Sequence, residues 1–286
     1  MSQTSKIAIL MATYNGEKYL AGQIESLLHQ TYQDWCLFVH DDGSQDGTTD
    51  LLRRFADSHP DRITILDYPS MGGPCANFLS LLTRVDAPYY MFCDQDDVWL
   101  PEKIGWSMAE LQKAERQHPD KGIVIHTDLQ IVDEKLCPVS ETMWHHAGIC
   151  PQYIRSFSDS GGHTAIATGC TMLFNHKAKD SVACHTAGKA LMHDSWVCLC
   201  TLREGGIVLG LDRPTVLYRQ HGNNSLGAGS TSAADIGMAY RLRNVRKVIS
   251  SNRLYYSMLC SLGYGSWLKY VLSKVKYKMR IRRGYY

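Results

Sequence analysis

Three apolar runs in the first third of the chain each end abruptly in a cluster of polar residues. The runs cover residues 6–12, 35–40 and 89–93, and the polar clusters cover residues 13–17, 41–46 and 94–97. Apolar runs of this length are typical of buried strands. Segments with helical periodicity separate them, at residues 17–30, 48–58 and 76–84. This alternation predicts an α/β fold in which helices cover both faces of a mostly parallel sheet.

Further strands are expected later in the chain, and they extend the same pattern. They lie at residues 63–66, 123–133 and 215–221, and residues 168–174 are expected to form a small-residue turn that enters a strand. Another helix is expected to begin at His193. In parallel sheets, ligands bind beyond the carboxyl ends of the strands. The three polar clusters are therefore expected to converge on one edge of the sheet, although they lie far apart in sequence.

The third polar cluster contains three carboxylates, Asp94, Asp96 and Asp97. Clustered carboxylates repel one another unless a cation neutralises them. In an extended segment Asp94 and Asp96 point the same way, so both can address one ion. Oxygen ligands suit Mg²⁺ or Mn²⁺. The alternative is a solvated turn or a helix N-cap, but a cap needs one acidic residue and not three. We therefore favour a metal site.

Three strand-end clusters, one of them metal-binding, suit a nucleotide diphosphate. Either Asp41 or Asp42 would accept a hydrogen bond from a pyrimidine N–H group. Asp94 would bond a ribose hydroxyl, and Asp96 would hold a divalent ion that bridges two phosphates. The chain has no Walker loop and no GxGxxG after its first strand, which argues against P-loop enzymes and dinucleotide dehydrogenases.

The composition describes an ordinary globular protein. Of its 286 residues 44% are hydrophobic and 20% charged, which suits one large domain or a domain with a small appendage. No secretory leader is expected, because residues 1–6 are polar and the apolar stretch that follows is too short. No window approaches the roughly 20 apolar residues of a membrane span. The ten cysteines lack CxxC spacing, which predicts free thiols in a reducing compartment.

The formal net charge of +2 hides an asymmetry between the two ends. The residues after Asp235 include 12 Lys and Arg and no acidic residue, which leaves 18 basic and 28 acidic residues before them. We divide the chain into a domain at 1–229 and a basic, helical C-terminal extension at 230–286. Apolar residues at 267, 268, 271, 272 and 275 have helical spacing, although basic and apolar residues alternate with strand period from Lys274 to Arg282.

The basic extension suits the surface of an anionic membrane. RNA binding is the other use of such a segment, but no nucleic-acid motif accompanies it. A solvated basic end without a partner is the remaining alternative.

Three motifs resemble the signatures of family 2 glycosyltransferases. They are Ala12-Thr13-Tyr14-Asn15-Gly16, Asp41-Asp42-Gly43-Ser44-Gln45-Asp46-Gly47-Thr48 and Asp94-Gln95-Asp96-Asp97. The resemblance covers residues 6–227 and implies an inverting enzyme with the Rossmann-like fold called GT-A. Two later segments, His193-Asp194-Ser195-Trp196 and Arg219-Gln220-His221-Gly222-Asn223-Asn224, add a narrower similarity to bacterial rhamnosyltransferases.

The resemblance implies a role for each matching residue. The residues that it implies in nucleotide-sugar binding are Thr13, Tyr14, Asn15, Glu17, Asp42 or less readily Asp41, Asn77 and Asp94. It implies Mg²⁺ or Mn²⁺ at Asp96 with His221 as a further ligand, and the catalytic base at Asp194. The implied enzyme transfers a sugar, with dTDP-rhamnose as the first candidate donor, to a lipid-linked or oligosaccharide acceptor in bacterial surface polysaccharide synthesis. Its expected place is cytoplasmic, at the inner face of the inner membrane.

Alternatives remain at several residues. Asp194 precedes an apolar run and would also serve as a helix N-cap. His221 would also suit an ordinary surface position. Lys103 is within reach of a phosphate, but a solvated helix face is the expectation for it.

Two other functions also remain. A sugar nucleotidyltransferase has a similar sheet, but it usually begins with a Gly- and Arg-rich loop where this chain has residues 12–16. A non-catalytic nucleotide-sugar-binding subunit would need neither the metal cluster nor Asp194.

Overall fold

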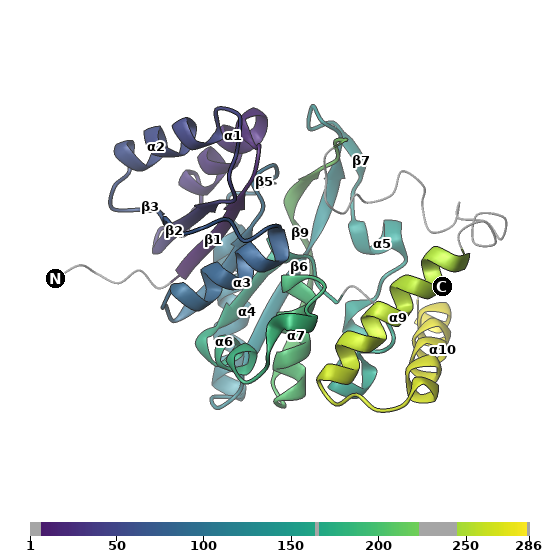
Figure 1. The fold of residues 1–286 in the computed structure, drawn as a ribbon. Coiled ribbons are helices and arrows are strands. Elements are labelled where there is room, and N and C mark those ends of the chain that lie inside the picture. The colour runs from purple at the N-terminus through teal and green to yellow at the C-terminus, as the bar shows by residue number, and fades with distance from the viewer. Residues whose placement is uncertain (1–6, 164–165, 223–244, 285–286) are drawn as a thin grey trace.

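The structure is a computed structural model that describes residues 7–163, 166–222 and 245–284. Within these residues nine strands form one sheet in the order β3-β2-β1-β4-β8-β6-β9-β5, with β7 paired to β6 (Figure 1). The strands are β1 (Ile7–Thr13), β2 (Trp35–Asp41), β3 (Ile63–Ile65), β4 (Tyr89–Cys93), β5 (Val98–Trp99), β6 (Ile123–Val132), β7 (Pro138–Ser140), β8 (Met172–Asn175) and β9 (Ile207–Arg219). The helices are α1 (Glu17–Leu28), α2 (Thr48–Ser58), α3 (Pro74–Arg84), α4 (Lys103–Gln117), α5 (Met143–Ala147), α6 (His176–Ala183), α7 (His193–Arg203), α9 (Val245–Ser261) and α10 (Trp267–Gly284).

Six of the nine described strands run in the same direction. β1 pairs in parallel with β2 and β4, β2 with β3, and β6 with β9. β8 lies antiparallel between β4 and β6, and β5 and β7 are antiparallel to their neighbours. The sheet is therefore mostly parallel, as predicted, and the carboxyl ends of β1, β2 and β4 share one edge.

Both faces of the sheet are buried beneath helices. In β1, Ile7, Ile9 and Met11 belong to one apolar cluster, whereas Ala8 and Leu10 belong to the other. The first cluster includes residues of α1, α2 and α4, and the second includes residues of α3, α6, α7, α9 and α10. Because alternate side chains of a strand point to opposite faces, cover on both sides requires an uninterrupted apolar run.

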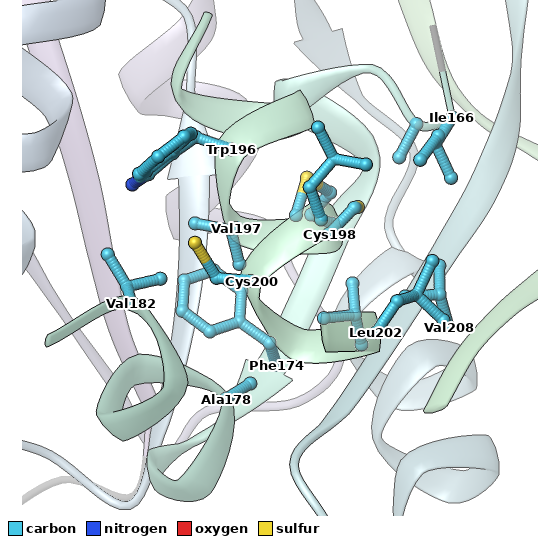
Figure 2. Packing of buried hydrophobic residues seen from close by; sticks show 14 of the residues in the cluster. Ile166, Phe174, Ala178, Val182, Trp196, Val197, Cys198, Cys200, Leu202 and Val208 are labelled. Carbon is cyan, nitrogen blue, oxygen red and sulfur yellow. The ribbon is translucent and has the colours of Figure 1, made fainter. Parts of the chain in front are cut away.

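Helix α7 lies in the interior and has almost no polar face. Its buried side chains pack among residues of β8, α6 and β9, as Figure 2 shows for Trp196, Val197, Cys198, Cys200, Leu202, Phe174, Ala178, Val182 and Val208. A helix that is apolar all round belongs in a core. This packing fixes the first turn of α7, which carries Asp194. All ten cysteines are free, as predicted, and several serve as small apolar core residues.

The predicted strands and helices up to α7 are confirmed, with small differences at their ends. The last predicted strand is longer than expected, since β9 begins at Ile207 and not near Thr215. Elements β5, β7, α5 and α6 were not predicted. β5 and β7 contain only two and three residues, which is too short for a periodic sequence pattern. Each is recognised only by its pairing with a neighbouring strand.

The C-terminal extension is helical in its described part, and the strand period after Lys274 is misleading. Helix α10 turns Tyr270, Tyr277 and Ile281 toward the apolar cluster beneath α7 and α9, while most of its basic side chains take exposed positions. No helix among the described residues is long and apolar enough to cross a membrane. The boundary at residue 229 falls within 223–244, outside the described residues, and the division into two domains stays a prediction.

We expect Tyr270→Ala to lower the free energy of unfolding by about 3 kcal/mol, because removal of a buried ring leaves a cavity. Tyr270 is 1% exposed and lies against the rings of Tyr255 and Tyr256. Leu268→Ala on the same helix is the matched control, since Leu268 is 66% exposed. The control should change the free energy by less than about 0.5 kcal/mol. Urea denaturation measures both, and equal effects would contradict the packing of α10 against the domain.

Candidate active site

A cavity of about 930 Å³ opens at the shared edge where β1, β2 and β4 end. This volume is within the range of small-molecule and cofactor sites. Nine of the eleven predicted site residues line it, namely Thr13, Tyr14, Asn15, Asp42, Asn77, Asp94, Asp96, Asp194 and His221. The convergence of the polar clusters is therefore confirmed as geometry, while the role of each residue stays a prediction.

Glu17 and Asp41 do not line the cavity. The Glu17 carboxylate accepts a hydrogen bond from the Gly47 N–H at 2.9 Å, which ties α1 to the loop after β2. The Asp41 carboxylate accepts from the Thr13 hydroxyl at 2.9 Å and from the backbone N–H of Ser44 at 2.8 Å. Both side chains are hydrogen-bonded to neighbouring loops and support the cavity wall, and their predicted part in donor binding stays a prediction.

Gln95 fastens the turn after β1 to the turn after β4, a contact that the sequence motifs did not reveal. Its side chain accepts a hydrogen bond from the Tyr14 N–H and donates one to the Tyr14 carbonyl, both at 2.9 Å. A Cβ atom at Gly16 would lie 2.3 Å from the Gln95 side-chain oxygen, so a larger residue there would displace the Gln95 amide from Tyr14. Asn15 has a positive φ of 47°, a conformation that asparagine tolerates better than most residues.

Asp42 holds the loop between β3 and α3 at one end of the cavity. Its carboxylate accepts hydrogen bonds from the Ser70 hydroxyl at 2.8 Å and from the backbone N–H of Gly73 at 2.8 Å, with Met71 and Gly72 also donating. Burial alone would raise the pKa of Asp42, but these hydrogen bonds outweigh it and lower the pKa. Asp42 is therefore an ionised acceptor.

The carboxylates after β4 repel one another strongly. Burial, together with the charges of Asp96 and Asp194, raises the pKa of Asp94 to about 7. Asp97 is fully buried, and burial and its acidic neighbours raise its pKa as well. One oxygen of Asp97 accepts from the Arg219 N–H at 3.1 Å. Without a cation, this cluster therefore retains protons near neutral pH.

Two side chains at and just after the end of β9, Arg219 and His221, contact the same cluster. The His221 ring Nε2 lies 2.8 Å from a carboxylate oxygen of Asp96. The Arg219 guanidinium is nearly buried and donates to the carbonyl oxygens of Asp96 at 2.8 Å and Glu134 at 2.6 Å. Arg219 therefore fixes the backbone around Asp96, and His221 contacts its side chain.

Two sets of side chains have the chemistry for a divalent cation. Asp94, Asp97 and Cys170 have ligand atoms within 4.8 Å of one another. Cys170 is fully buried, and burial and the two carboxylates raise the pKa of its thiol well above the ordinary range, so the sulfur keeps its proton. Neither Cys170 nor Asp97 lines the cavity. Asp96 and His221 do, beside Asp94, and this oxygen and imidazole set suits Mn²⁺ or Mg²⁺ better.

Lys103 is completely buried behind the acidic cluster, so the expectation of a solvated helix face is wrong. Its ammonium group lies 4.5 Å from the centre of the Trp99 ring and has no hydrogen-bond acceptor among the described residues. Burial lowers the pKa of Lys103 to about 8, although the nearby charges of Cys170, Cys93 and Asp97 act to raise it. Lys103 is the first residue of α4, shortly after β5, and its side chain points inward. It therefore places a cation beneath the carboxylates that follow β4.

Asp194 lies in the first turn of α7, where the N-cap position belongs to Met192. Its carboxylate accepts from the backbone N–H of Gly169 at 3.1 Å and of Ser195 at 2.5 Å. Burial raises the pKa of Asp194, and these hydrogen bonds offset only part of the effect. The result is a fixed carboxylate that faces the cavity and is more basic than an exposed one. Two other carboxylates of the chain, Asp128 and Asp159, are not among the lining residues.

His193, next to Asp194, is a buried neutral ring. It stacks on Phe78 and meets Phe92 edge-on, and burial lowers its pKa to about 3. A Cβ atom at Gly169 would lie 2.5 Å from His193 Nε2. Glycine at 169 therefore allows the segment before β8 to approach α7 closely enough to bond Asp194.

One wall of the cavity comes from the loop between β6 and β7, which the sequence did not associate with the site. The Glu134 carboxylate pairs with the Lys18 ammonium and accepts from the Tyr19 hydroxyl at 2.8 Å. The Tyr19 ring also lies 4.8 Å from the ring of His221. Lys18, Tyr19 and Glu134 all line the cavity. No residue pattern marks them, because only the fold brings this loop to α1.

Comparison with known proteins gives one family and several relatives. Residues 8–182 match Glycosyl transferase family 2. The dTDP-rhamnosyl transferase RfbG of Shigella flexneri is 28% identical over 249 residues, which cover 82% of this chain and 79% of RfbG. The UDP-Glc:alpha-D-GlcNAc-diphosphoundecaprenol beta-1,3-glucosyltransferase WfgD of Escherichia coli is 32% identical over 107 residues, which cover 37% of this chain and 41% of WfgD.

Solved structures share the fold. The mannosyltransferase PcManGT of Pyrobaculum calidifontis, in complex with GDP-Man and Mn²⁺, superposes with a TM-score of 0.55 at 14% identity. The superposition covers 94% of this chain and 87% of PcManGT. Agreement at such low identity shows that the sheet and its helices have the same arrangement.

We expect the metal-free protein to lose stability through Asp94 as the pH rises from about 4 to about 7. The pKa of Asp94 is about 7 in the folded chain against an ordinary 3.8, so the unfolded chain releases this proton first and the free energy of unfolding falls. Thermal melting in a chelator across this range measures the slope. Asp94→Asn should make the slope less negative, and Mn²⁺ should do the same in the unsubstituted protein.

Two buried histidines change the stability in the opposite direction with pH, but they are present in both the unsubstituted protein and Asp94→Asn. Burial lowers the pKa of His126 to about 4 and that of His193 to about 3, so their contribution to stability grows as the pH rises. The difference between Asp94→Asn and the unsubstituted protein therefore isolates Asp94. A pH-independent difference would contradict the raised pKa.

Proposed function

The chain belongs to glycosyl transferase family 2, and we propose that it moves a sugar from a nucleotide diphosphate to an acceptor hydroxyl with inversion at the anomeric carbon. One observation carries the proposal. The Asp96–His221 pair and the Asp194 carboxylate on the first turn of α7 line the same cavity. A metal-binding pair suits the charge of a diphosphate, and a fixed basic carboxylate suits the proton of an alcohol. In-line displacement of a nucleoside diphosphate by an alcohol needs both.

The nucleoside end of the donor is proposed to lie between the 13–17 turn and Asp42. Tyr14 presents a ring that is 55% exposed, and such rings stack on bases. Asp42 is an ionised acceptor held in place by the 70–73 loop, and it retains lone pairs for a base N–H group. Thr13, Asn15 and Asn77 supply further polar groups along the same wall.

The diphosphate is proposed to lie over Asp96 and His221, with Mg²⁺ or Mn²⁺ as the cofactor and Asp94 near the ribose. When bound, such an ion stabilises the negative charge that develops on the leaving diphosphate. Asp96 is positioned for this purpose by Arg219, whose guanidinium holds the Asp96 backbone. His221 lies 125 residues after Asp96 in the chain, contacts its carboxylate and would add a nitrogen ligand.

Asp194 is proposed to be the catalytic base. The backbone N–H groups of Gly169 and Ser195 orient its carboxylate, and burial makes that carboxylate a stronger base. As the acceptor oxygen attacks the anomeric carbon, its proton passes to the carboxylate and the bond from the carbon to the diphosphate oxygen breaks. The attack comes from the face opposite the leaving group, so the configuration inverts.

The donor, acceptor and location are finer proposals that rest on the relatives. We propose dTDP-rhamnose as the first donor to test, because RfbG is a dTDP-rhamnosyl transferase. A lipid-linked acceptor is supported by WfgD, whose name specifies a diphosphoundecaprenol acceptor. Synthesis of a bacterial surface polysaccharide at the cytoplasmic face of the inner membrane would bring the basic C-terminal helices to an anionic lipid surface.

Donor turnover is expected to require Mg²⁺ or Mn²⁺ and to fall by at least about a hundredfold in Asp96→Ala, because the leaving charge is no longer stabilised. Asp57→Ala, which removes an exposed carboxylate from α2, is the control and should behave like the unsubstituted protein. Release of nucleoside diphosphate from a panel of nucleotide sugars measures turnover. His221→Ala should cause a smaller loss and a weaker response to Mn²⁺. Full turnover in excess chelator would remove the ion from the mechanism.

Asp194→Asn should lower transfer by about a hundredfold or more while donor binding is retained, because the amide keeps the shape of the side chain but not its basicity. Single-turnover transfer and donor-induced thermal stabilisation measure the two properties separately. The products also separate the functional alternatives. A glycosyltransferase would transfer sugar, a nucleotidyltransferase would exchange nucleotide with pyrophosphate, and a binding subunit would catalyse neither reaction. Transfer by Asp194→Asn near the unsubstituted rate would assign the base to another residue.

A further inference from the structure

Helix α10 exposes a stripe of large apolar side chains along its outer side. The stripe consists of Trp267, Leu268, Val271, Leu272, Val275 and Met279, which are between 38% and 66% exposed. Leu268, Leu272, Val275 and Met279 recur every three or four residues, so they lie on one side of an α-helix. Scattered apolar residues on a surface are ordinary, but a continuous stripe of this kind marks an interaction site.

The stripe faces outward because the opposite side of α10 is anchored. Tyr270 and Tyr277 are buried in the same apolar cluster as α7 and α9, and Ile281 packs against that cluster. The Tyr270 hydroxyl donates to the Asn252 side-chain oxygen at 2.7 Å, and the Tyr277 hydroxyl accepts from the Cys150 N–H at 2.8 Å. At 100° per residue, Tyr270 and Tyr277 lie nearly opposite Leu268 and Met279. The helix therefore cannot turn to bury the stripe without losing its anchors.

Exposed cations lie on both sides of the row formed by Leu268, Leu272, Val275 and Met279. At 3.6 residues per turn, Lys269, Lys276 and Arg283 lie on one side of this row. Lys278 and Arg282 lie on the other side, together with Trp267 and Val271. The sequence has no acidic residue after Asp235, so no carboxylate of this segment neutralises them. An apolar stripe between two rows of cations is the pattern of a helix that lies in the plane of a membrane interface.

We propose that the α10 stripe is a lipid-docking face, which inserts its apolar side chains at the headgroup boundary of an anionic phospholipid bilayer while the flanking Lys and Arg contact lipid phosphates. This docking face specifies which surface of the enzyme would meet the membrane and how it would bind. It rests on the proposed function only for the expectation of a lipid-linked acceptor. Docking through a second copy of the chain is disfavoured, since it would bring two rows of cations together. A solvated end is disfavoured by the apolar area that it would leave in water.

Helix α9 connects this face to the candidate base. Tyr255 of α9 lies 6.4 Å from Tyr270 of α10, measured between ring centroids. Tyr255 also lines a small groove of about 220 Å³ with Met192 and Ser195, the neighbours of His193 and Asp194. Figure 1 shows α9 between α7 and α10. Docking through α10 would therefore hold α7 one helix layer from the bilayer surface.

Vesicle co-sedimentation tests the docking face with the full chain. Vesicles of neutral phosphatidylcholine are compared with vesicles that also contain phosphatidylglycerol, across a series of salt concentrations. We expect binding to the anionic vesicles that salt weakens but does not abolish, because the cations are screened and the apolar contacts are not. Binding that is equal for the two kinds of vesicle, or absent for both, would overturn the proposal.

Two substitutions in the stripe separate it from the rest of the surface. Leu268→Gln with Leu272→Gln should lower the partition onto anionic vesicles by at least about tenfold without loss of charge. The matched control is Val139→Gln with Leu209→Gln, which changes two exposed apolar residues on β7 and β9 and should bind like the unsubstituted protein. Unchanged binding of the stripe variant would overturn the proposal.

A second pair of variants tests the borders. Lys276→Gln, Lys278→Gln and Arg282→Gln together should remove the preference for anionic vesicles. The control neutralises three exposed cations elsewhere, Lys113, Arg116 and Lys135, and should keep that preference. Equal loss in both variants would mean that total charge and not the α10 face governs binding.

Trp267 provides a direct readout of insertion. It is 44% exposed at the start of the stripe, whereas Trp35, Trp99, Trp144 and Trp196 are buried. Lipids brominated on their acyl chains should quench its fluorescence, and Trp267→Phe should remove the quenching. Donor turnover with a soluble acceptor should be unchanged in every stripe variant, so failure of docking and failure of the proposed function are distinguishable. Sedimentation that reveals a dimer dissolved by the stripe variant would assign the face to a second copy and overturn the proposal.

Discussion

Repulsion among the carboxylates at the end of β4 is the constraint on which much of the surrounding structure depends. Asp94, Asp96 and Asp97 lie within four residues, and the negative charge of each is offset in a different way. Asp94 retains a proton near neutral pH, Asp96 meets His221, and Asp97 receives the backbone N–H of Arg219. Lys103 adds a buried cation from the opposite side. The position of β9 beside β5 and the inward direction of Lys103 on α4 are therefore tied to the charge at this one strand end.

Much of this arrangement was accessible from the sequence because both faces of the sheet are covered. Such strands appear as uninterrupted apolar runs, and their ends are marked sharply by the first polar residue. Asp42, Asp94 and Asp96 could be grouped for that reason alone, since parallel strands bring their carboxyl ends together. The segment around Asp194 carried a weaker signal, because a carboxylate ahead of an apolar helix also serves as a cap. In the structure Met192 occupies the N-cap position and Asp194 lies in the first turn of α7, so the N-cap interpretation is wrong, while the role of base stays a prediction.

The contacts that the sequence did not predict all depend on which elements pack together. Gln95 bonds both backbone groups of Tyr14, and Glu134 reaches Tyr19 across the cavity, but neither partner lies near the other in sequence. Lys103 looked like part of a solvated helix face because the two residues of β5 that turn it inward have no periodicity of their own. In α10 the alternation of basic and apolar residues from Lys274 to Arg282 suggested a strand. The helical turn instead buries Tyr277, turns Ile281 toward the core and leaves Val275 and Met279 exposed beside the cations.

The place of β9 in the sheet has a consequence for how the protein is made. β9 is the last described strand in chain order, yet it lies inside the sheet between β6 and β5. The contacts of Arg219 with Asp97 and of His221 with Asp96 span 122 and 125 residues. Pairing over such separations raises contact order and slows folding. A nascent chain exposes its acidic cluster long before residues 219 and 221 emerge to meet it, so the candidate active site forms only when the sheet closes. A fragment that ends before β9 would keep all three N-terminal motifs and still lack the site.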